Sequence, residues 1–91
     1  MYFAIYCVDK PDHGQVRADN RQAHLDYLNS FRDQVHCAGP LTTDDGSAML
    51  GSLLIMEFAD KAKAQSFAEN DPYSKAGLFQ FVDIHHWKKV I

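Results

Sequence analysis

The order of two residue patterns along the chain limits the fold more than any other feature of the sequence. Apolar residues that alternate or run together over a few positions predict strands, and apolar residues recurring every three or four positions predict helices. From the N-terminus, these patterns give strand, helix, strand, strand, helix, strand. That order is typical of the ferredoxin-like βαββαβ arrangement, an α+β fold with both helices on one face of an antiparallel sheet. We expect residues 1–91 to form one such domain.

Four segments carry the features of strands, which are enrichment in aromatic and β-branched residues and bounding turn signals. They are residues 2–9, 35–42, 49–58 and 79–88. The second segment contains Pro40, which cannot donate a hydrogen bond to a neighbouring strand, so we expect this strand at an edge of the sheet. The sequence Asp44-Asp45-Gly46 predicts a hairpin turn between the second and third strands.

Two segments carry helical periodicity. The first runs from Asp19 to about Val35, after a loop at residues 10–14, and places His24, Leu28, Phe31 and Val35 on one stripe. In the second, Asp60 is expected to cap a helix that continues to about Asn70. Its inward stripe consists of Ala64, Phe67 and Ala68, and Asp71 continues it. Pro72 restricts Asp71 to an extended backbone and is expected to stop the helix before a turn region at residues 73–77.

The predicted sheet is apolar on both faces. In the last strand Phe79, Phe81 and Trp87 alternate with Val82 and Ile84, and in the third strand Leu53 and Ile55 alternate with Leu54 and Met56. An antiparallel sheet that has helices on one face and apolar residues on both normally buries its second face as well. The simplest cover is the sheet of a second copy, so we expect a two-fold homodimer, a dimeric α+β barrel.

Charge and hydropathy exclude two classes of partner. The formal net charge is −3 and no run of basic residues is present, which argues against binding of nucleic acid. No apolar stretch is long enough to cross a bilayer, and the N-terminal residues lack the basic leader and the cleavage site of a signal peptide. We therefore expect a cytoplasmic protein that has no contact with membranes.

Cysteine and histidine spacing does not indicate a metal site. Cys7 and Cys37 do not have the spacing of metal ligands, and in a reducing compartment both are expected to be buried and free. His85 and His86 are neighbours on a strand, so their side chains point to opposite faces and cannot easily share a metal ion. We expect neither a metal nor another cofactor.

The predicted topology brings five polar side chains to one end of the sheet. Asp9 ends the first strand, Arg17 lies in the loop that enters the first helix, and His24 lies in the first turns of that helix. Ser52 is near the start of the third strand, and Asp71 ends the second helix at the same level. Residues far apart in the sequence are therefore expected to share one site.

The chemistry of this group centres on His24 and Asp71. A carboxylate that accepts a hydrogen bond from one imidazole nitrogen fixes the tautomer and leaves the other nitrogen as a general base. Pro72 limits the backbone of Asp71 and so the orientation of its carboxylate. Taken alone, a histidine on an apolar stripe is more often a core residue, and an aspartate before proline often caps a turn. The predicted convergence of the two favours a functional pair.

The remaining polar residues have a structural and a functional interpretation. Arg17 and Ser52 suit the binding of an enolate or phenolate oxygen, and Asp9 can hold Arg17 in place. Asp9 and Arg17 could equally form a surface ion pair of little consequence, and Ser52 an ordinary hydrogen-bonded strand residue. Tyr73 is expected in the core or dimer contacts, although it lies close enough to Asp71 to touch a ligand.

Several motifs together resemble one known family. They are Arg21-Gln-Ala-His24-Leu-Asp-Tyr-Leu28, Ala38-Gly-Pro-Leu41, Gly51-Ser-Leu-Leu-Ile55, Asp71-Pro-Tyr73 and Ala76-Gly-Leu-Phe79. In this order, and over nearly the whole chain, they are similar to the YCII-related (YciI-like) family. The resemblance implies a dimeric ferredoxin-like fold with a His–Asp pair at its active site, which falls here on His24 and Asp71.

The resemblance also implies a reaction. One enzyme branch of the family is a dehydrochlorinase of chlorinated hydroxyhydroquinone in aromatic degradation, and likeness to it implies oxygen-binding roles for Arg17 and Ser52 and supporting roles for Asp9 and Pro72. We therefore expect a cofactor-free lyase that converts a hydroxylated, chlorinated ring to a quinone. A muconolactone-type isomerase and a non-catalytic protein that binds a small molecule remain open as alternatives, because a fold does not set the reaction.

Overall fold

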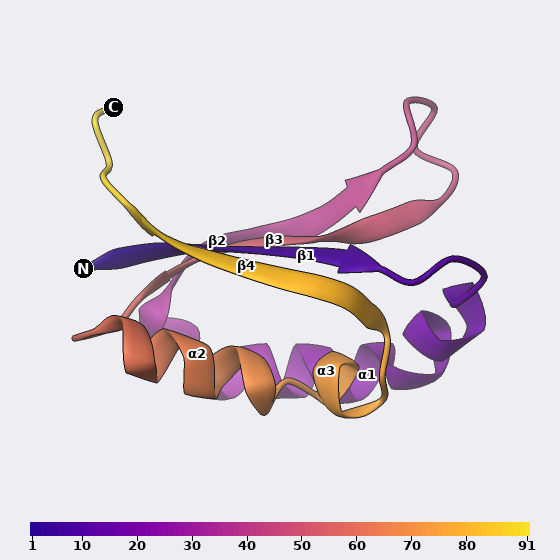
Figure 1. Cartoon of the computed structure of the whole chain (residues 1–91), viewed down its shortest axis with the longest axis horizontal. Coiled ribbons are helices and arrows are strands. Elements are labelled where there is room, and N and C mark those ends of the chain that lie inside the picture. The colour runs from indigo at the N-terminus through magenta and orange to yellow at the C-terminus, as the bar shows by residue number, and fades with distance from the viewer.

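The computed structural model describes residues 1–91 and shows a four-stranded antiparallel sheet with helices on one face (Figure 1). The elements are β1 (Tyr2–Asp9), α1 (Gly14–Ser30), a 3₁₀ turn (Arg32–Gln34), β2 (Val35–Thr42), β3 (Met49–Glu57), α2 (Lys61–Glu69), α3 (Pro72–Lys75) and β4 (Phe79–Trp87). The strand order is β2-β3-β1-β4, so β2 lies at an edge as Pro40 predicted. This is the predicted ferredoxin-like arrangement.

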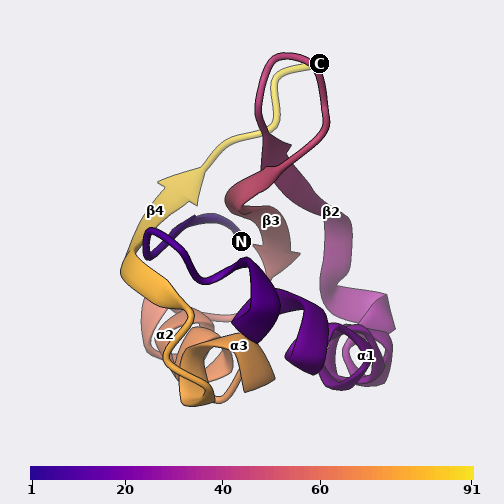
Figure 2. The ribbon, with the colours of Figure 1, turned by 90° about the vertical axis from the view of Figure 1, so that its right-hand side faces the viewer.

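The helices form one layer beneath the sheet. Seen from the end, α1 lies under the side of the sheet that holds β2, and α2 and α3 lie under the side that holds β4 (Figure 2). The loop between β2 and β3 and the last residues of the chain extend from the opposite face. None of the helices combines the length and the hydropathy needed to span a bilayer. The arrangement brings α1 and α3 side by side, which is where the site described below is found.

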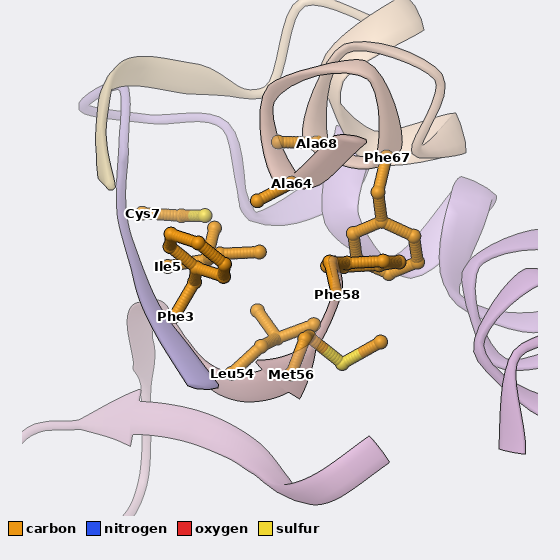
Figure 3. Packing of buried hydrophobic residues seen from close by; sticks show 9 residues of the cluster. All are labelled: Phe3, Ile5, Cys7, Leu54, Met56, Phe58, Ala64, Phe67 and Ala68. Atoms are coloured by element: carbon orange, nitrogen blue, oxygen red, sulfur yellow. The ribbon is translucent and has the colours of Figure 1, made fainter. Parts of the chain in front are cut away.

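The core lies between the sheet and α2 (Figure 3). In β1 every second residue faces the helices, and Phe3, Ile5 and Cys7 are each at most 2% exposed. Ser52, Leu54 and Met56 pair with these residues from β3 and are buried as well. From α2, Ala64, Phe67 and Ala68 complete the layer, as their helical spacing predicted. This packing fixes the orientation of β1 and β3, which carry two residues of the site.

The first helix begins and ends earlier than the periodicity indicated. It starts at Gly14 rather than at residue 19, and it ends at Ser30 rather than near residue 35. Its first turn carries no apolar stripe, so the hydrophobic pattern could not reveal it. At the other end a 3₁₀ turn follows, and Phe31 and Val35 still pack against the core. The apolar pattern therefore continued past the end of the helix.

The second helix follows the prediction until Pro72. Asp60 caps α2 by accepting a hydrogen bond from the backbone N–H of Lys63 at 2.9 Å, and Asn70 ends the helix. Of the turn region predicted at residues 73–77, residues 73–75 belong instead to the short helix α3, and residues 76–77 form a turn as predicted. Proline is well tolerated at the first position of a helix, because the N–H it lacks has no partner there. Pro72 thus ends one helix and starts the next.

The last strand contains a bulge that places Phe79 on the opposite face of the sheet from Phe81, although the alternation predicted both on one face. Val8 pairs with Phe81, but the next residue of β1, Asp9, pairs with Phe79, so Gln80 is an extra residue in β4. A bulge of this kind turns the flanking side chains to different faces of the sheet. Phe79 therefore lies on the helix side, with its ring centroid 6.0 Å from that of Tyr73, while Phe81 remains on the open face.

The face of the sheet away from the helices is uncovered in the single chain. Tyr6, Leu53 and Phe81 lie there and are each about two-fifths exposed, at 40%, 39% and 44%. The two-sided apolar pattern predicted for β3 and β4 is therefore present. Cys7 is buried as expected, but Cys37 is exposed, because it lies on the edge strand β2 on the face that no helix covers.

Candidate active site

A cavity of about 380 Å³ opens between α1, the strands β2 and β3, and Tyr73 of α3. This volume is in the range of small-molecule sites and suits a single substituted ring. Arg17, His24, Ser52 and Tyr73 line it, together with apolar side chains from α1 and both strands. Four of the residues predicted for the site therefore share one cavity wall.

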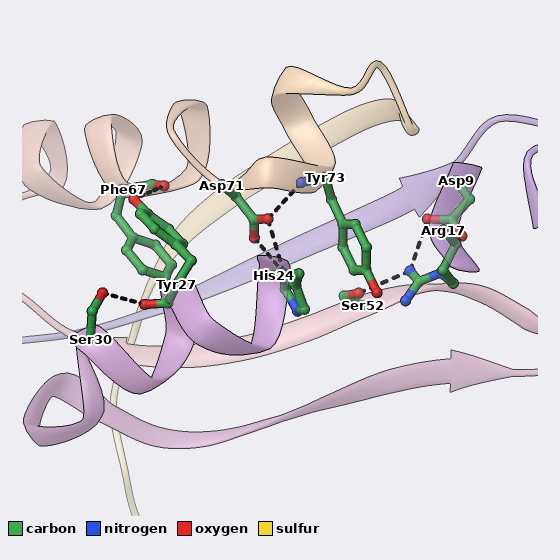
Figure 4. A network of polar contacts seen from close by, with 9 residues as sticks. All are labelled: Asp9, Arg17, His24, Tyr27, Ser30, Ser52, Phe67, Asp71 and Tyr73. Carbon is green, nitrogen blue, oxygen red and sulfur yellow. Dashed lines mark hydrogen bonds and ion pairs between the residues drawn. The ribbon is translucent and has the colours of Figure 1, made fainter. Parts of the chain in front are cut away.

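His24 and Asp71 form a buried pair at this wall (Figure 4). The imidazole Nδ1 is 2.9 Å from Oδ1 and 3.0 Å from Oδ2 of the carboxylate, and the two side chains are 9% and 5% exposed. An ionised carboxylate can only accept hydrogen bonds, so Nδ1 carries the proton in this contact. Nε2 makes no hydrogen bond within the chain, which leaves it free to accept a proton from a molecule in the cavity.

The backbone around Asp71 holds its carboxylate in place. Asp71 has the extended backbone that Pro72 requires, with φ −60° and ψ 131°. Its Oδ1 also accepts a hydrogen bond from the backbone N–H of Tyr73 at 2.8 Å, which caps α3. The capping interaction and the contact with His24 are therefore made by the same side chain. The sequence presented these as alternatives, and the structure contains both.

Arg17 is held by Asp9 and Ser52. Its Nε donates to Oδ2 of Asp9 at 2.8 Å, and one terminal nitrogen donates to Oδ1 of Asp9 and to Oγ of Ser52, both at 3.0 Å. Burial opposes the charge of Arg17, but the hydrogen bond and charge of Asp9 outweigh it and raise the pKa of Arg17. The pair is buried and not a surface contact, so the guanidinium stays charged and fixed at the cavity.

Tyr73 lies between the His24–Asp71 pair and Arg17. Its ring stacks on the imidazole of His24 with centroids 4.0 Å apart, and the guanidinium carbon of Arg17 lies 4.7 Å from the ring centroid. Burial raises the pKa of the Tyr73 hydroxyl, and the charges of Arg17 and Arg21 offset this only in part. Tyr73 is therefore a neutral, buried ring between a base and a cation.

The structure places Arg17 differently from the expectation. It lies in α1 and not in the loop before it, because that helix starts at Gly14. Arg21 also lines the cavity, one turn further along the helix, and had been given no role. Arg17, Arg21 and His24 follow the spacing i, i+4 and i+7, so extending the stripe of His24 towards the N-terminus would have found Arg21.

No group of three or more histidine, cysteine or acidic side chains in the structure could hold a metal ion. The polar groups of the cavity are instead a histidine, two arginines, a serine and a tyrosine. These side chains can take up a proton and can bind oxygen atoms that carry negative charge.

Comparison with known proteins agrees with the motifs. The YCII-related domain matches residues 1–88. The chain belongs to the YCII family. Relatives named Protein YciI, from Escherichia coli O6:H1 and from Shigella flexneri, are each 37% identical to it, with 99% of this chain and 99% of the relative covered. A Haemophilus influenzae protein is 30% identical over the same shares.

One solved structure is similar in both sequence and fold to this YCII-family chain. It is the 5-chloro-2-hydroxyhydroquinone dehydrochlorinase TftG from Burkholderia phenoliruptrix, in complex with 2,5-dihydroxybenzoquinone. The two chains are 43% identical, the match covers 97% of this chain and 94% of the other, and the TM-score is 0.89. The family and the ferredoxin-like fold predicted from the motifs are thereby confirmed.

Proposed function

We propose that this protein is a dehydrochlorinase-like lyase that acts on a hydroxylated, chlorinated aromatic ring without a cofactor. The observation that carries the proposal is the hydrogen-bonded pair of His24 and Asp71 on the wall of a cavity that suits one ring. The similarity to a protein named as a dehydrochlorinase of 5-chloro-2-hydroxyhydroquinone, solved with a quinone bound, supports this class of substrate.

In the proposed reaction His24 is the general base. Its Nε2 takes the proton of a ring hydroxyl, and the carboxylate of Asp71 stabilises the imidazolium that forms. Pro72 and the N–H of Tyr73 keep that carboxylate in the orientation that the imidazole needs. A positioned base of this kind contributes about 10²–10⁴-fold to the rate.

Arg17 and Ser52 stabilise the negative charge that develops on the ring oxygen. The Ser52 oxygen accepts a hydrogen bond from Arg17, so its own O–H remains available to donate to the substrate. Asp9 holds the guanidinium by two hydrogen bonds, which orients the donors before the substrate arrives. Asp9 is thus a positioning residue in this mechanism.

The proposed reaction removes one proton and one chloride ion from the ring and needs no oxidant. The proton taken from the ring hydroxyl is returned by His24 to the carbon that holds chlorine, which becomes tetrahedral and gives a chlorinated dienone. His24 then removes the proton of a second hydroxyl, the C–Cl bond breaks, and its electron pair leaves with chloride. The ring has lost one proton and one chloride ion and is a quinone. Each step needs only the base and the oxygen-binding groups described above.

We also propose that the protein works as a homodimer in which a second copy covers the open face of the sheet. Tyr6, Leu53 and Phe81 expose apolar surface there, and an antiparallel sheet of this composition is normally covered on both faces. Sedimentation of the purified protein should give the mass of two chains. Introducing a charge with Leu53→Glu should give monomers, and a monomeric wild type would contradict this part of the proposal.

The reaction can be tested directly with 5-chloro-2-hydroxyhydroquinone in oxygen-free buffer, because such rings oxidise in air. Chloride and quinone should appear in equal amounts and faster than without protein. No chloride from folded protein would contradict the proposal. Turnover of muconolactone in a parallel assay would then favour an isomerase, because a His–Asp pair can also move a proton on a lactone. Binding of the ring without turnover would favour a non-catalytic binding protein.

A further inference from the structure

The two arginines of the cavity differ in burial and in partners. Arg17 is 9% exposed and is paired with Asp9, whose carboxylate is 2.8 Å from its Nε. Arg21 lines the same cavity but is exposed and forms neither an ion pair nor a side-chain hydrogen bond with the rest of the chain. Arg17 therefore lies inside the cavity with its charge compensated, and Arg21 lies at its mouth with its charge free.

The cavity holds no acidic side chain that could neutralise Arg21. The two carboxylates nearest the site, Asp9 and Asp71, do not line the cavity and are already bound to Arg17 and His24. The whole chain carries a net charge of −3, so a positive cavity mouth is the reverse of its general charge. A free cation at the rim of a largely apolar cavity attracts anions and repels cations.

The charge of Arg21 also reaches the interior of the cavity. It is among the charges that favour ionisation of the Tyr73 hydroxyl, against the larger opposing effect of burial. Arg17 and Arg21 are one helical turn apart, about 6 Å along the axis, which is comparable with the width of a substituted six-membered ring. One ring can therefore present an oxygen to each arginine.

We propose that Arg21 binds an ionised substituent of the substrate, so that the cavity selects rings that enter as anions, such as phenolates or carboxylates. This inference rests on the proposed function, because it concerns the substrate of that same cavity. Arg21 binds the charge that the ring already carries, whereas Arg17 and Ser52 face the charge that appears during the reaction. Arg21 is thus a residue that determines which rings bind.

The test measures binding and does not require turnover. Calorimetry at neutral pH compares 2,5-dihydroxybenzoquinone, which is a dianion there, with hydroquinone, which is neutral, in oxygen-free buffer. Arg21→Gln should weaken binding of the dianion about tenfold, the effect of one charged contact. It should change binding of hydroquinone by less than about twofold, since no charge is involved.

Two further variants and salt complete the design. Arg21→Lys keeps the charge and should retain most of the affinity for the dianion. Arg32→Gln removes an arginine that lies outside the cavity and donates only to Asn29, so it should leave both affinities unchanged. Raising the ionic strength should weaken binding of the dianion to wild type and have little effect on Arg21→Gln.

The outcomes separate this inference from the proposed reaction. Equal weakening of both probes by Arg21→Gln, no weakening at all, or a wild type that does not bind the dianion would each overturn the role of Arg21. The wild type could release no chloride while Arg21→Gln weakens binding of the dianion alone. That result would contradict the dehydrochlorinase reaction and leave the anion-binding role of Arg21 intact.

Discussion

The ring of Tyr73 stacks on the imidazole of His24, with centroids 4.0 Å apart and planes inclined by only 13°. The carboxylate of Asp71 holds the edge of the same imidazole at Nδ1. A ring that is bonded at its edge and covered on one face has little freedom to turn. Tyr73 therefore helps to fix the orientation of the His24 ring at the cavity.

Substitution of Tyr73 should separate stacking from the hydroxyl group. Tyr73→Phe keeps an aromatic ring over His24 and should retain kcat within about threefold, whereas Tyr73→Leu removes the stack and should lower kcat about tenfold, the upper end for an aromatic pair. Steady-state kinetics of chloride release measure both. If Tyr73→Leu keeps the kcat of Tyr73→Phe, stacking does not orient the base.

Asp71→Asn should remove most activity and keep the fold. The amide oxygen can still accept the N–H of Tyr73, but the amide nitrogen would donate to Nδ1 of His24 and place the imidazole proton on Nε2. The base would then carry a proton where it must accept one, and kcat should fall about 10²–10⁴-fold. Asp26→Asn, which changes an exposed acid on α1, the helix of His24, serves as the control. More than a tenth of wild-type kcat in Asp71→Asn would refute the role of the pair.

Gly51 allows β1 and β3 to approach closely. A Cβ atom at this position would clash with the carbonyl oxygen of Cys7, whereas one at Gly39 would meet nothing within 4 Å. Gly51→Ala should therefore lower the free energy of unfolding by about 1–3 kcal/mol, the usual effect of overpacking. Gly39→Ala should change it little. Urea unfolding measures both, and similar values for the two variants would show that the strands can move apart.

Cys7 should make the protein less stable at high pH. Burial, with the nearby charges of Asp71 and Asp9, raises the pKa of this thiol from 9.0 to about 12. Between these values the unfolded chain has lost the proton and the folded chain keeps it, so unfolding becomes easier as pH rises. The stabilising effect is complete below about pH 9 and is lost towards pH 12, with a slope of up to about 1.4 kcal/mol per pH unit.

The second cysteine of the chain, Cys37, provides a control for this pH dependence. Cys7→Ala should reduce the loss of stability between pH 9 and 11, and Cys37→Ala, which changes an exposed thiol, should not. Urea unfolding in the presence of a reductant follows both variants. An unchanged slope in Cys7→Ala would assign the alkaline loss of stability to other groups.

The fold could be predicted because each element has a local pattern. β1 was placed without error by its composition, β2 at an edge by Pro40, and the start of α2 by the cap at Asp60. The start of α1 was wrong because its first turn faces a cavity and solvent and so has no apolar period. The bulge at Gln80 was missed because the pairing of β1 with β4 decides it, and no local signal marks that pairing.

The topology predicted where the site residues lie, and their chemistry predicted the contacts of His24 with Asp71 and of Arg17 with Asp9. The order of the strands predicted that His24 and Asp71 would approach, and the structure brings them to 2.9 Å. The sequence did not reveal the stacking of Tyr73 on His24 or the free charge of Arg21, because both depend on how α3 and α1 pack. These two features therefore require the assembled fold.

The central claim is that His24 removes a proton from the substrate, and the kcat of a His24 variant tests it most directly. We would measure chloride release from 5-chloro-2-hydroxyhydroquinone by wild type, His24→Ala, His24→Gln and His13→Ala, the last removing a histidine outside the cavity. The account predicts that both His24 variants fold and lose about 10²–10⁴-fold in kcat, while His13→Ala keeps it. Folded His24 variants with the wild-type rate of chloride release would contradict the account.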